Sequence, residues 1–267
     1  MKSNFPNCFA ITVGQEGGYD TNPKDRGNWT SGKIGVGELK GTKYGIAAFV
    51  YPNVDIEHLT VADAQAIYAR DYWPKIAGDL QPAGVDLVAW DICVNSGASR
   101  SLRIEGEALG TDNRAPATLA VFASGYPDKV DLIKRMCAAR AAFYRSLSTF
   151  ETFGRGWLRR NATIEAQGVR MAVAATGAPA EKQKEALTKE ASKANKSAKT
   201  QAGGTAGTAT AGGAGSTQVD WSFDWTLVGK VALAAALVVV IIVFVRQYLA
   251  HRERAAAYNA AAAGIVT

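Results

Sequence analysis

Two carboxylic acids and a hydroxyl lie close together near the start of the chain, at Glu16, Asp25 and Thr30. Cleaving a glycosidic bond needs a proton donor for the leaving oxygen and a second group that stabilises the oxocarbenium-like state or activates water. Glu16 is the candidate donor, and the other two follow it after a two-glycine bend. Because Asp25 beside a proline also fits an ordinary turn, the spacing alone leaves a catalytic and a structural interpretation open.

The setting of Glu16 favours the catalytic interpretation. Phe5, Phe9 and Val13 recur at helical spacing, and Glu16 extends this apolar stripe before two glycines end the helix. A carboxyl group partly withdrawn from water has a raised pKa and keeps a proton near neutral pH, which a general acid requires. The alternative is a solvent-facing glutamate at the helix C-terminus, where the helix dipole disfavours it.

The elements that must position these groups are a loop and a set of helices. Residues 22–45 are rich in glycine and lack helical periodicity, so we expect short strands around tight turns. Further on, apolar residues recur at helical spacing in segments that begin near 61, 84, 130 and 156, and Thr60 with Asp63 predicts a capping box. The sequence therefore predicts a mainly α-helical fold with a glycine-rich loop or small β region. Four further residues are interpreted as structural, namely Asp71, Asp91, Asn95 and Cys93.

One motif resembles a known family. The stretch EGGYDTNPKDRGNWTSG, followed by KYGI, is similar to the start of the family 108 glycoside hydrolases, the N-acetylmuramidases of phage endolysins and bacterial secretion-linked muramidases. The similarity continues in YARDYWPKI and WDICVNSG, and then in a peptidoglycan-binding-like half with LGTDNRAPAT and RGWLRR. It spans most of residues 5–170. The resemblance implies a lysozyme-like helical fold that cleaves the β-1,4 bond between N-acetylmuramic acid and N-acetylglucosamine.

The resemblance also implies roles for particular residues. The family's glutamate corresponds to Glu16 as the general acid, and Asp25 and Thr30 become candidates for positioning water. Aromatic side chains could stack on sugar faces, and the candidates for substrate binding are Tyr19, Trp29 and Tyr44. Trp73 could do the same, but packing in the core explains it at least as well.

The chain departs from the family pattern at two places. Asn28 stands where the family often has a second glycine. The stretch TSGKIGVGELKG is an insertion between Thr30 and Tyr44, which could reshape the rim of a cleft or move Thr30. The role of Thr30 is therefore more open than that of Glu16.

Charge and cysteine content narrow the class of partner. The net charge is +6 and the sequence pI about 9.2, which suits an anionic partner. The basic residues are spread out rather than interleaved with aromatics, so we expect peptidoglycan and not nucleic acid. The three cysteines lack short spacing, and the two histidines form no ligand pair. We therefore expect no disulfide framework, no metal site and no cofactor.

The C-terminal third has a different composition. Residues 226–245 form an apolar run of bilayer length, with aromatic residues at both ends and arginines after it, and predict a single C-terminal transmembrane helix. We expect domains at 1–90 (muramidase catalytic region), 91–176 (peptidoglycan-binding-like helical region), 177–220 (flexible linker) and 246–267 (basic tail). The predicted location is the bacterial (host) inner membrane, as a single-pass protein with its catalytic domain facing the wall, although no good signal peptide precedes that domain.

Together these features predict a membrane-tethered muramidase, used as an endolysin for host cell lysis. Two alternatives stay open at this point. A lytic transglycosylase also uses one glutamate but leaves a 1,6-anhydro product. A non-catalytic, membrane-anchored peptidoglycan-binding adaptor would need neither Glu16 nor Asp25.

Overall fold

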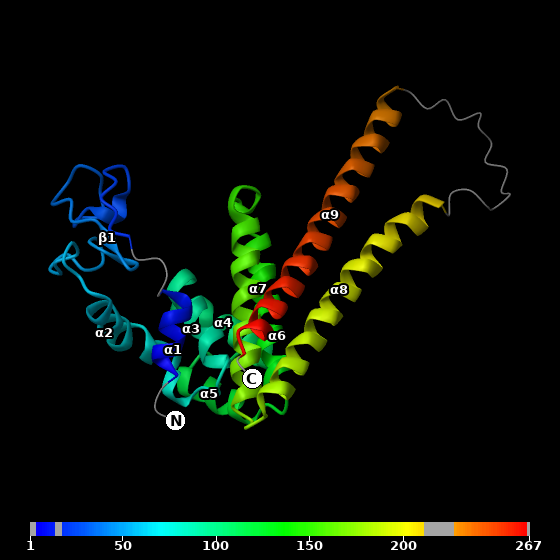
Figure 1. Cartoon of the computed structure of the whole chain (residues 1–267). Helices are drawn as coiled ribbons and strands as arrows, with labels where there is room; N and C mark the ends of the chain where they lie inside the picture. The colour runs from blue at the N-terminus through cyan, green and yellow to red at the C-terminus, as the bar shows by residue number, and fades with distance from the viewer. Residues whose placement is uncertain (1–3, 14–17, 211–226, 266–267) are drawn as a thin grey trace. The chain divides into compact units, whose positions relative to one another are not determined.

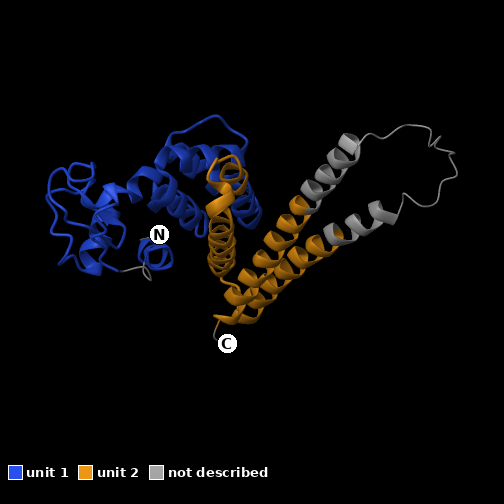
Figure 2. Ribbon diagram, turned by 90° about the horizontal axis from the view of Figure 1, so that it is seen from above, with its two compact units in different colours: residues 1–140 blue, residues 141–267 orange. Residues whose placement is uncertain are grey.

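The chain is mainly helical and divides into two compact units. The computed structural model describes residues 4–13, 18–210 and 227–265, and the side chains of 4–13, 18–200 and 242–265. Figure 1 shows the elements, and Figure 2 colours the units, which we call unit 1 (residues 1–140) and unit 2 (residues 141–267). The division falls inside helix α6 (Lys129–Arg145). The functional boundaries expected at 90 and 176 stay predictions.

In unit 1 the only described strands, β1 and β2, lie in the long loop between helices α1 and α2. In chain order its elements are α1 (Phe5–Thr12), η1 (Arg26–Asn28), β1 (Thr42–Lys43), β2 (Ile46–Ala47), α2 (Val61–Asp71), η2 (Trp73–Ile76), η3 (Gly78–Leu80), α3 (Val85–Ser96), α4 (Ala98–Leu109), α5 (Pro116–Gly125) and the first part of α6. The capping box predicted at the start of α2 is confirmed, because Asp63 N–H donates to Thr60 Oγ1 and Thr60 N–H donates to Asp63 Oδ2.

The core of unit 1 is built around Trp90 of α3. Its ring is fully buried and lies 5.4 Å from Phe5 of α1, 5.5 Å from Tyr68 of α2 and 5.8 Å from Trp73 of η2, measured between centroids. These edge-to-face arrangements are favourable for aromatic rings. Trp73 is thus a core residue, with its indole N–H donating to Asp79 Oδ1 at 3.0 Å.

Helix α3 lies at the centre of unit 1. Every residue from Val85 to Cys93 is buried, although the spacing of apolar residues predicts only one buried face. A helix covered on all sides buries its whole circumference. The chain then turns at Gly97, where φ of 85° favours glycine, and continues as α4.

Helix α1 is shorter than the sequence predicts. It ends at Thr12, with Val13 N–H donating to the carbonyl of Phe9, so the described helix does not extend to Glu16. The last residues are β-branched and a glycine follows, which together weaken the helix. Residues 14–17, and Glu16 with them, lie outside the part of the chain that the structure describes.

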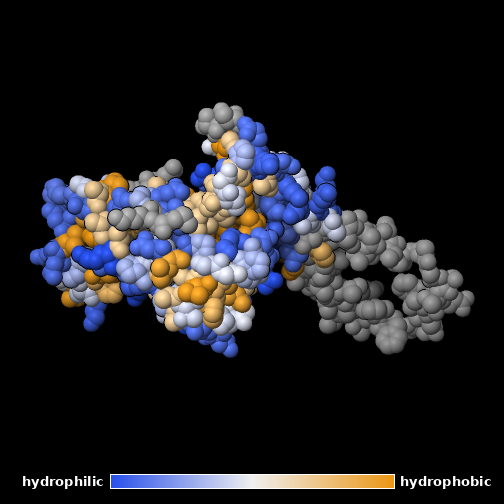
Figure 3. Space-filling view, turned by 90° about the horizontal axis from the view of Figure 1, so that it is seen from below, coloured by the Kyte–Doolittle hydropathy of each residue, from blue (hydrophilic) through white to orange (hydrophobic). Residues whose placement is uncertain are grey.

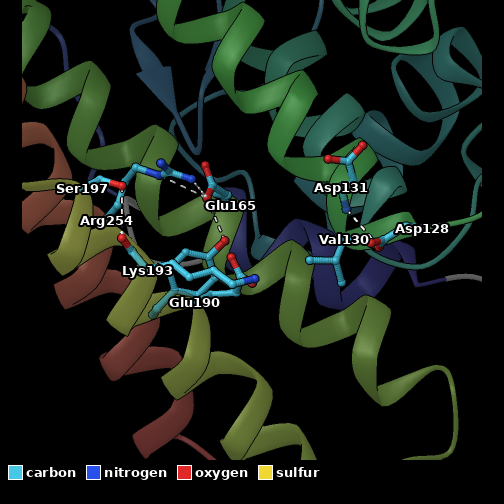
Figure 4. A network of polar contacts seen from close by, with 9 residues as sticks. Asp128, Val130, Asp131, Glu165, Glu190, Lys193, Ser197 and Arg254 are labelled. Atoms are coloured by element: carbon cyan, nitrogen blue, oxygen red, sulfur yellow. Dashed lines mark hydrogen bonds and ion pairs between the residues drawn. The ribbon is translucent and has the colours of Figure 1, made fainter. Parts of the chain in front are cut away.

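The described part of unit 2 contains three long helices, α7 (Phe150–Ala174), α8 (Ala180–Thr210) and α9 (Leu227–Ala263). Helices α8 and α9 run side by side, and both pack against α7. Buried Glu165 of α7 accepts a hydrogen bond from Nη2 of Arg254 on α9 at 2.5 Å (Figure 4). It also accepts one from Oη of Tyr258 on α9 at 2.7 Å. The segment expected to be a flexible linker, 177–220, therefore contributes a packed helix, with Leu187 and Ala191 buried.

The predicted transmembrane helix at 226–245 is wrong. Among the residues described, no helix is long and apolar enough to cross a membrane. Beyond Ile242, α9 carries charged residues that pair with α7, including Arg246 with Glu151 at 2.5 Å and Arg254 with Glu165. This part of α9 packs as a polar bundle helix, so the expected single-pass topology, bilayer contact and inner-membrane location are corrected with it.

Apolar side chains also reach the surface, as the small hydrophobic patches on the face in Figure 3 show. In the glycine-rich loop and just after it, the exposed large apolar residues are Ile34, Val36, Leu39, Phe49 and Val50. Scattered exposure of this kind is normal. Since these side chains bury little area, the loop must be held by other contacts.

Candidate active site

The candidate site residues that the structure describes lie in one stretch, residues 18–47. Its strands β1 and β2 pair antiparallel, with Thr42 opposite Ala47 and Lys43 opposite Ile46. Two further bridges, Asp20 with Thr42 and Trp29 with Leu39, fold the rest of the stretch against this hairpin. Backbone pairing therefore brings the segments that carry Tyr19, Trp29 and Tyr44 together.

Asn28 is the centre of this loop. It is fully buried, and its side-chain nitrogen donates to Asp20 Oδ2 at 2.9 Å and to the carbonyl of Asn22 at 3.1 Å. Its side-chain oxygen accepts from Thr42 Oγ1 at 2.7 Å. Its own carbonyl accepts from the N–H groups of residues 40 and 41 at 3.0 Å. One side chain thus ties three segments of the loop together, a role that glycine cannot fill.

Asp25 and Trp29 are held in the first half of the loop. Asp25 caps η1, and its Oδ1 accepts from Gly27 N–H at 2.8 Å while the side chain stays exposed. The indole N–H of Trp29 donates to the carbonyl of Pro23 at 2.9 Å. This bond fixes the ring against the turn that carries Asp25. An exposed carboxylate beside a half-exposed indole is an arrangement that a sugar could contact.

Thr30 closes the insertion. Its N–H donates to the carbonyl of Glu38 at 2.9 Å, and its Oγ1 accepts from Glu38 N–H at 3.0 Å. A Cβ on Gly37 would lie 2.5 Å from Oγ1, so this glycine makes room for the contact. The hydroxyl oxygen of Thr30 is already used within the loop, which leaves its proton as the group available for a water molecule or a substrate.

The two tyrosines lie at turns. Tyr19 is exposed and donates to the carbonyl of Lys40 at 3.2 Å. Tyr44 and Gly45 connect β1 to β2 with φ of 53° and 74°, as a two-residue hairpin of type I′ requires. A tyrosine rarely adopts this backbone conformation. Tyr68 Oη holds the turn by donating to the carbonyl of Tyr44 at 3.2 Å.

A buried contact anchors the helix that precedes Glu16. Asn4, the N-cap of α1, donates from Nδ2 to Asp86 Oδ2 at 2.7 Å. Asp86 Oδ1 accepts from the N–H groups of Gly84 and Leu87, each at 2.7 Å. Burial raises the pKa of Asp86 to about 6 in spite of these bonds. Asp86 therefore fixes the start of α1 against α3.

The residues interpreted as structural have structural contacts. Asp91 pairs with Arg140 at 2.7 Å, with both side chains fully buried, and Asn95 donates to the carbonyl of Asp91 rather than to its carboxylate. Asp71 accepts from Arg70 and from Tyr51 Oη, and the bond with Arg70 is the main cause that lowers its pKa to about 2. Cys93 is buried and free.

Asn28 is the residue that sequence reasoning missed. It stands out in the sequence only as a departure from a glycine, and nothing in its neighbours shows that it is buried. A polar residue that replaces glycine in a tight loop can be the signal of a hydrogen-bonding centre, since Asn tolerates turns and offers both donors and acceptors.

Comparisons with known proteins agree with the site region. Residues 9–97 match the family model described as Glycosyl hydrolase 108. The solved structure of SagA from Brucella abortus is similar, with a TM-score of 0.52 and 28% identity over 64% of this chain and 97% of the SagA chain. No curated protein matches the chain. The matched segment contains all six candidate residues. Over residues 9–97 the chain therefore belongs to the glycosyl hydrolase 108 family and is a glycoside hydrolase.

Proposed function

We propose that this chain hydrolyses the β-1,4 bond between N-acetylmuramic acid and N-acetylglucosamine in bacterial peptidoglycan, with Glu16 as the general acid. The family supports peptidoglycan as the substrate. The observation that carries the proposal is that the matched segment includes Glu16 together with the loop that Asn28 organises. Glu16 would protonate the leaving glycosidic oxygen as the oxocarbenium-like state develops.

Asp25 and Thr30 take supporting roles in this proposal. The exposed carboxylate of Asp25 would stabilise the positive charge on the sugar or accept a proton from the attacking water. Thr30 would donate its remaining hydroxyl proton to that water, since its oxygen already accepts from Glu38. Tyr19, Trp29 and Tyr44 would bind the sugar rings through their faces.

Substitution of Glu16 tests the proposal directly. Glu16→Gln keeps the shape of the side chain and removes the acid, so we expect the full-length protein to release reducing ends from purified peptidoglycan at least ~100-fold more slowly. The matched control is Glu57→Gln, an exposed glutamate in the same matched segment, which should stay within about twofold of the parent. Equal rates for the parent and Glu16→Gln would refute the assignment.

The products separate the proposal from its two alternatives. Hydrolysis gives a reducing N-acetylmuramic acid end, whereas a transglycosylase gives a 1,6-anhydro end that mass spectrometry detects as the loss of one water. A protein that binds peptidoglycan and releases neither product would be an adaptor. We expect the reducing end.

Lysis of a host cell, as an endolysin performs it, is the biological use that we propose for this reaction. The net charge of +6 is complementary to an anionic wall. Expression of the parent with a fused export signal should lower the turbidity of a bacterial culture, and Glu16→Gln should not. Continued growth with the active parent exported would contradict this use.

A further inference from the structure

A pocket on unit 1 lies apart from the candidate active site. It has a volume of about 510 Å³ and is lined by Ser96, Ser99, Arg100, Leu102, Arg103 and Arg114. All of these except Ser96 follow the segment that matches the family model, which ends at residue 97. Three of the six lining residues are arginines, and none is acidic. The pocket is therefore a concave, positively charged surface with two hydroxyl groups.

The arginines reach the pocket from two places. Arg100 and Arg103 are three residues apart on α4, so they lie on one face of the helix. Arg114 follows α4 and turns back over it, where Nη1 donates to the carbonyls of Thr111 at 2.8 Å and Asn113 at 2.6 Å. A Cβ on Gly106 would lie 2.1 Å from that nitrogen, so only glycine allows the guanidinium to lie there.

Two of these arginines, Arg103 and Arg114, have no buried acidic partner among the described residues. Among the described residues, Arg103 makes no ion pair or side-chain hydrogen bond, and it is exposed. The nearest acidic partner of Arg114 is Asp112, at 3.9 Å from Nη2, and the side chain of Asp112 is wholly exposed. The first turn of α4 has no acidic residue and no side-chain cap, so its N–H groups add positive potential beside Ser99. Arg103, Arg114 and the N-terminus of α4 therefore all favour an anion in the pocket.

We propose that this pocket binds the free carboxylates of the peptide stems on peptidoglycan, as a second contact outside the catalytic loop. This inference rests on the proposed function for its choice of substrate. Guanidinium groups bind carboxylates through paired, charge-assisted hydrogen bonds, and serine hydroxyls can donate to the same oxygens. The carboxylates of peptidoglycan are carried mostly by its stems, so the pocket selects glycan that still carries peptides.

A binding experiment compares two substrates. Full-length protein carrying Glu16→Gln, which prevents turnover, is sedimented with intact sacculi and with glycan stripped of its stems by an amidase. We expect Arg103→Gln in this background to weaken binding to intact sacculi about fivefold, the scale of one charge-assisted contact at an exposed site. Stripped glycan keeps one lactyl carboxylate on each N-acetylmuramic acid but has lost the carboxylates of the stems. On it we expect the Glu16→Gln protein to bind more weakly than on intact sacculi, and Arg103→Gln to cause a smaller loss than on intact sacculi.

The matched control removes the same charge elsewhere on unit 1. Arg135 on α6 is exposed and pairs with Asp131 at 2.7 Å, outside the pocket. Arg135→Gln should bind intact sacculi as the parent does. An equal loss in both variants would show a general effect of charge and overturn the inference, and so would an unchanged affinity of Arg103→Gln.

A soluble competitor identifies the anion. D-alanyl-D-alanine at millimolar concentration should displace the protein from intact sacculi, and inorganic phosphate at the same ionic strength should not. Displacement by phosphate alone would assign the pocket to a phosphate polymer and overturn the proposal. Because these readouts are binding, they are independent of catalysis. If Glu16→Gln in the otherwise intact protein hydrolysed as fast as the parent, the proposed function would fail while the pocket result stood.

Discussion

The glycine-rich loop and the helical core of unit 1 differ in how far their polar side chains are buried and in what those side chains bond to. In the loop, most polar side chains are exposed and bond to nearby backbone, and only Asn28 is buried. In the core, polar side chains are few and buried, and they contact one another, as Asp91 does with Arg140 and Glu105 with Gln81. A buried polar group that loses its partner is costly, whereas an exposed one is rescued by water. We therefore expect the core to decide the stability of unit 1 and the loop to decide its activity.

The largest effect should come from the buried ion pair. Arg140→Ala leaves the carboxylate of Asp91 buried without its cation, at a cost of about 3–5 kcal/mol in the free energy of unfolding. Arg135→Ala breaks the exposed pair with Asp131 on the same helix and should cost at most ~1 kcal/mol. Urea unfolding followed by circular dichroism measures both.

A double variant sharpens this test. Asp91→Leu with Arg140→Met removes both charges, so it should recover part of the loss of Arg140→Ala. If Arg140→Ala were no more destabilising than Arg135→Ala, burial would not determine how much the Asp91–Arg140 pair contributes to stability. The contrast between core and loop would then not hold.

The next effect is a pH dependence that comes from Glu105. Burial raises the pKa of this carboxyl to about 7 from its ordinary value of 4.5, and the hydrogen bond from Gln81 only partly opposes this. Among the described residues, Glu105 Oε2 and Gln81 Oε1 are both buried without a partner, and a proton on Oε2 would provide a donor there.

The direction in which stability changes with pH follows from the number of protons bound by the folded and the unfolded chain. Between pH 4.5 and 7 the folded protein keeps the proton on Glu105 and the unfolded chain has released it, so stability falls as pH rises through this range. The full change corresponds to about 3 kcal/mol, since one pKa unit is worth about 1.36 kcal/mol. Asp86, with its pKa raised to about 6, acts in the same direction.

Glu105→Gln provides the measurement. It is neutral at every pH, so urea midpoints taken from pH 4.5 to 7 should fall less steeply than those of the parent. The matched control, Glu107→Gln, is an exposed residue on the same helix and should leave the slope unchanged. A fall in Glu105→Gln as steep as that of the parent, or steeper, would contradict the assignment.

In the loop, Asn28→Ala should have a smaller effect on stability and a larger one on catalysis. It removes the bonds to Asp20, Asn22 and Thr42. We expect a cost of about 2 kcal/mol, with the helical circular dichroism signal retained. Hydrolysis of peptidoglycan should fall at least ~10-fold, because Asn28 holds together the loop, which we call the frame, that positions Asp25 and Thr30.

Asn53→Ala is the comparison for this variant, since Asn53 is an exposed residue in a neighbouring turn. It should keep both stability and rate. Full activity in Asn28→Ala would show that the frame does not position the catalytic groups, and would move the candidate site elsewhere.

The same contrast explains what could be predicted from sequence. The segments that begin near 61, 84, 130 and 156 are helices because their apolar spacing is set by burial, and the capping box of α2 needs only two neighbouring residues. The full burial of α3 was not predictable, since it depends on what covers each face. The role of Asn28 depends on partners 6 to 14 residues away that pair only after the loop has closed.

The end of the chain shows another limit of local patterns. The composition of 177–220 predicts a flexible linker that is partly helical at best, and that of 226–245 predicts a membrane span. The structure has α8 and α9 packed on α7 instead, with Glu165 paired to Arg254 across the bundle. A window of hydropathy does not include such partners, which come from residues about 90 positions away in the sequence.

The smallest predicted effect separates stability from activity at one residue. Tyr44 has a φ of 53°, a conformation that costs a non-glycine residue about 1 kcal/mol. Tyr44→Gly should therefore raise the unfolding free energy by up to ~1 kcal/mol, while hydrolysis slows if the ring contacts a sugar. Tyr126→Gly, at a residue with ordinary φ of −67°, should lose stability instead. If Tyr44→Gly were more stable and kept the full rate of hydrolysis, the ring of Tyr44 would not be needed for substrate binding. The strained backbone at Tyr44 would then have no catalytic role.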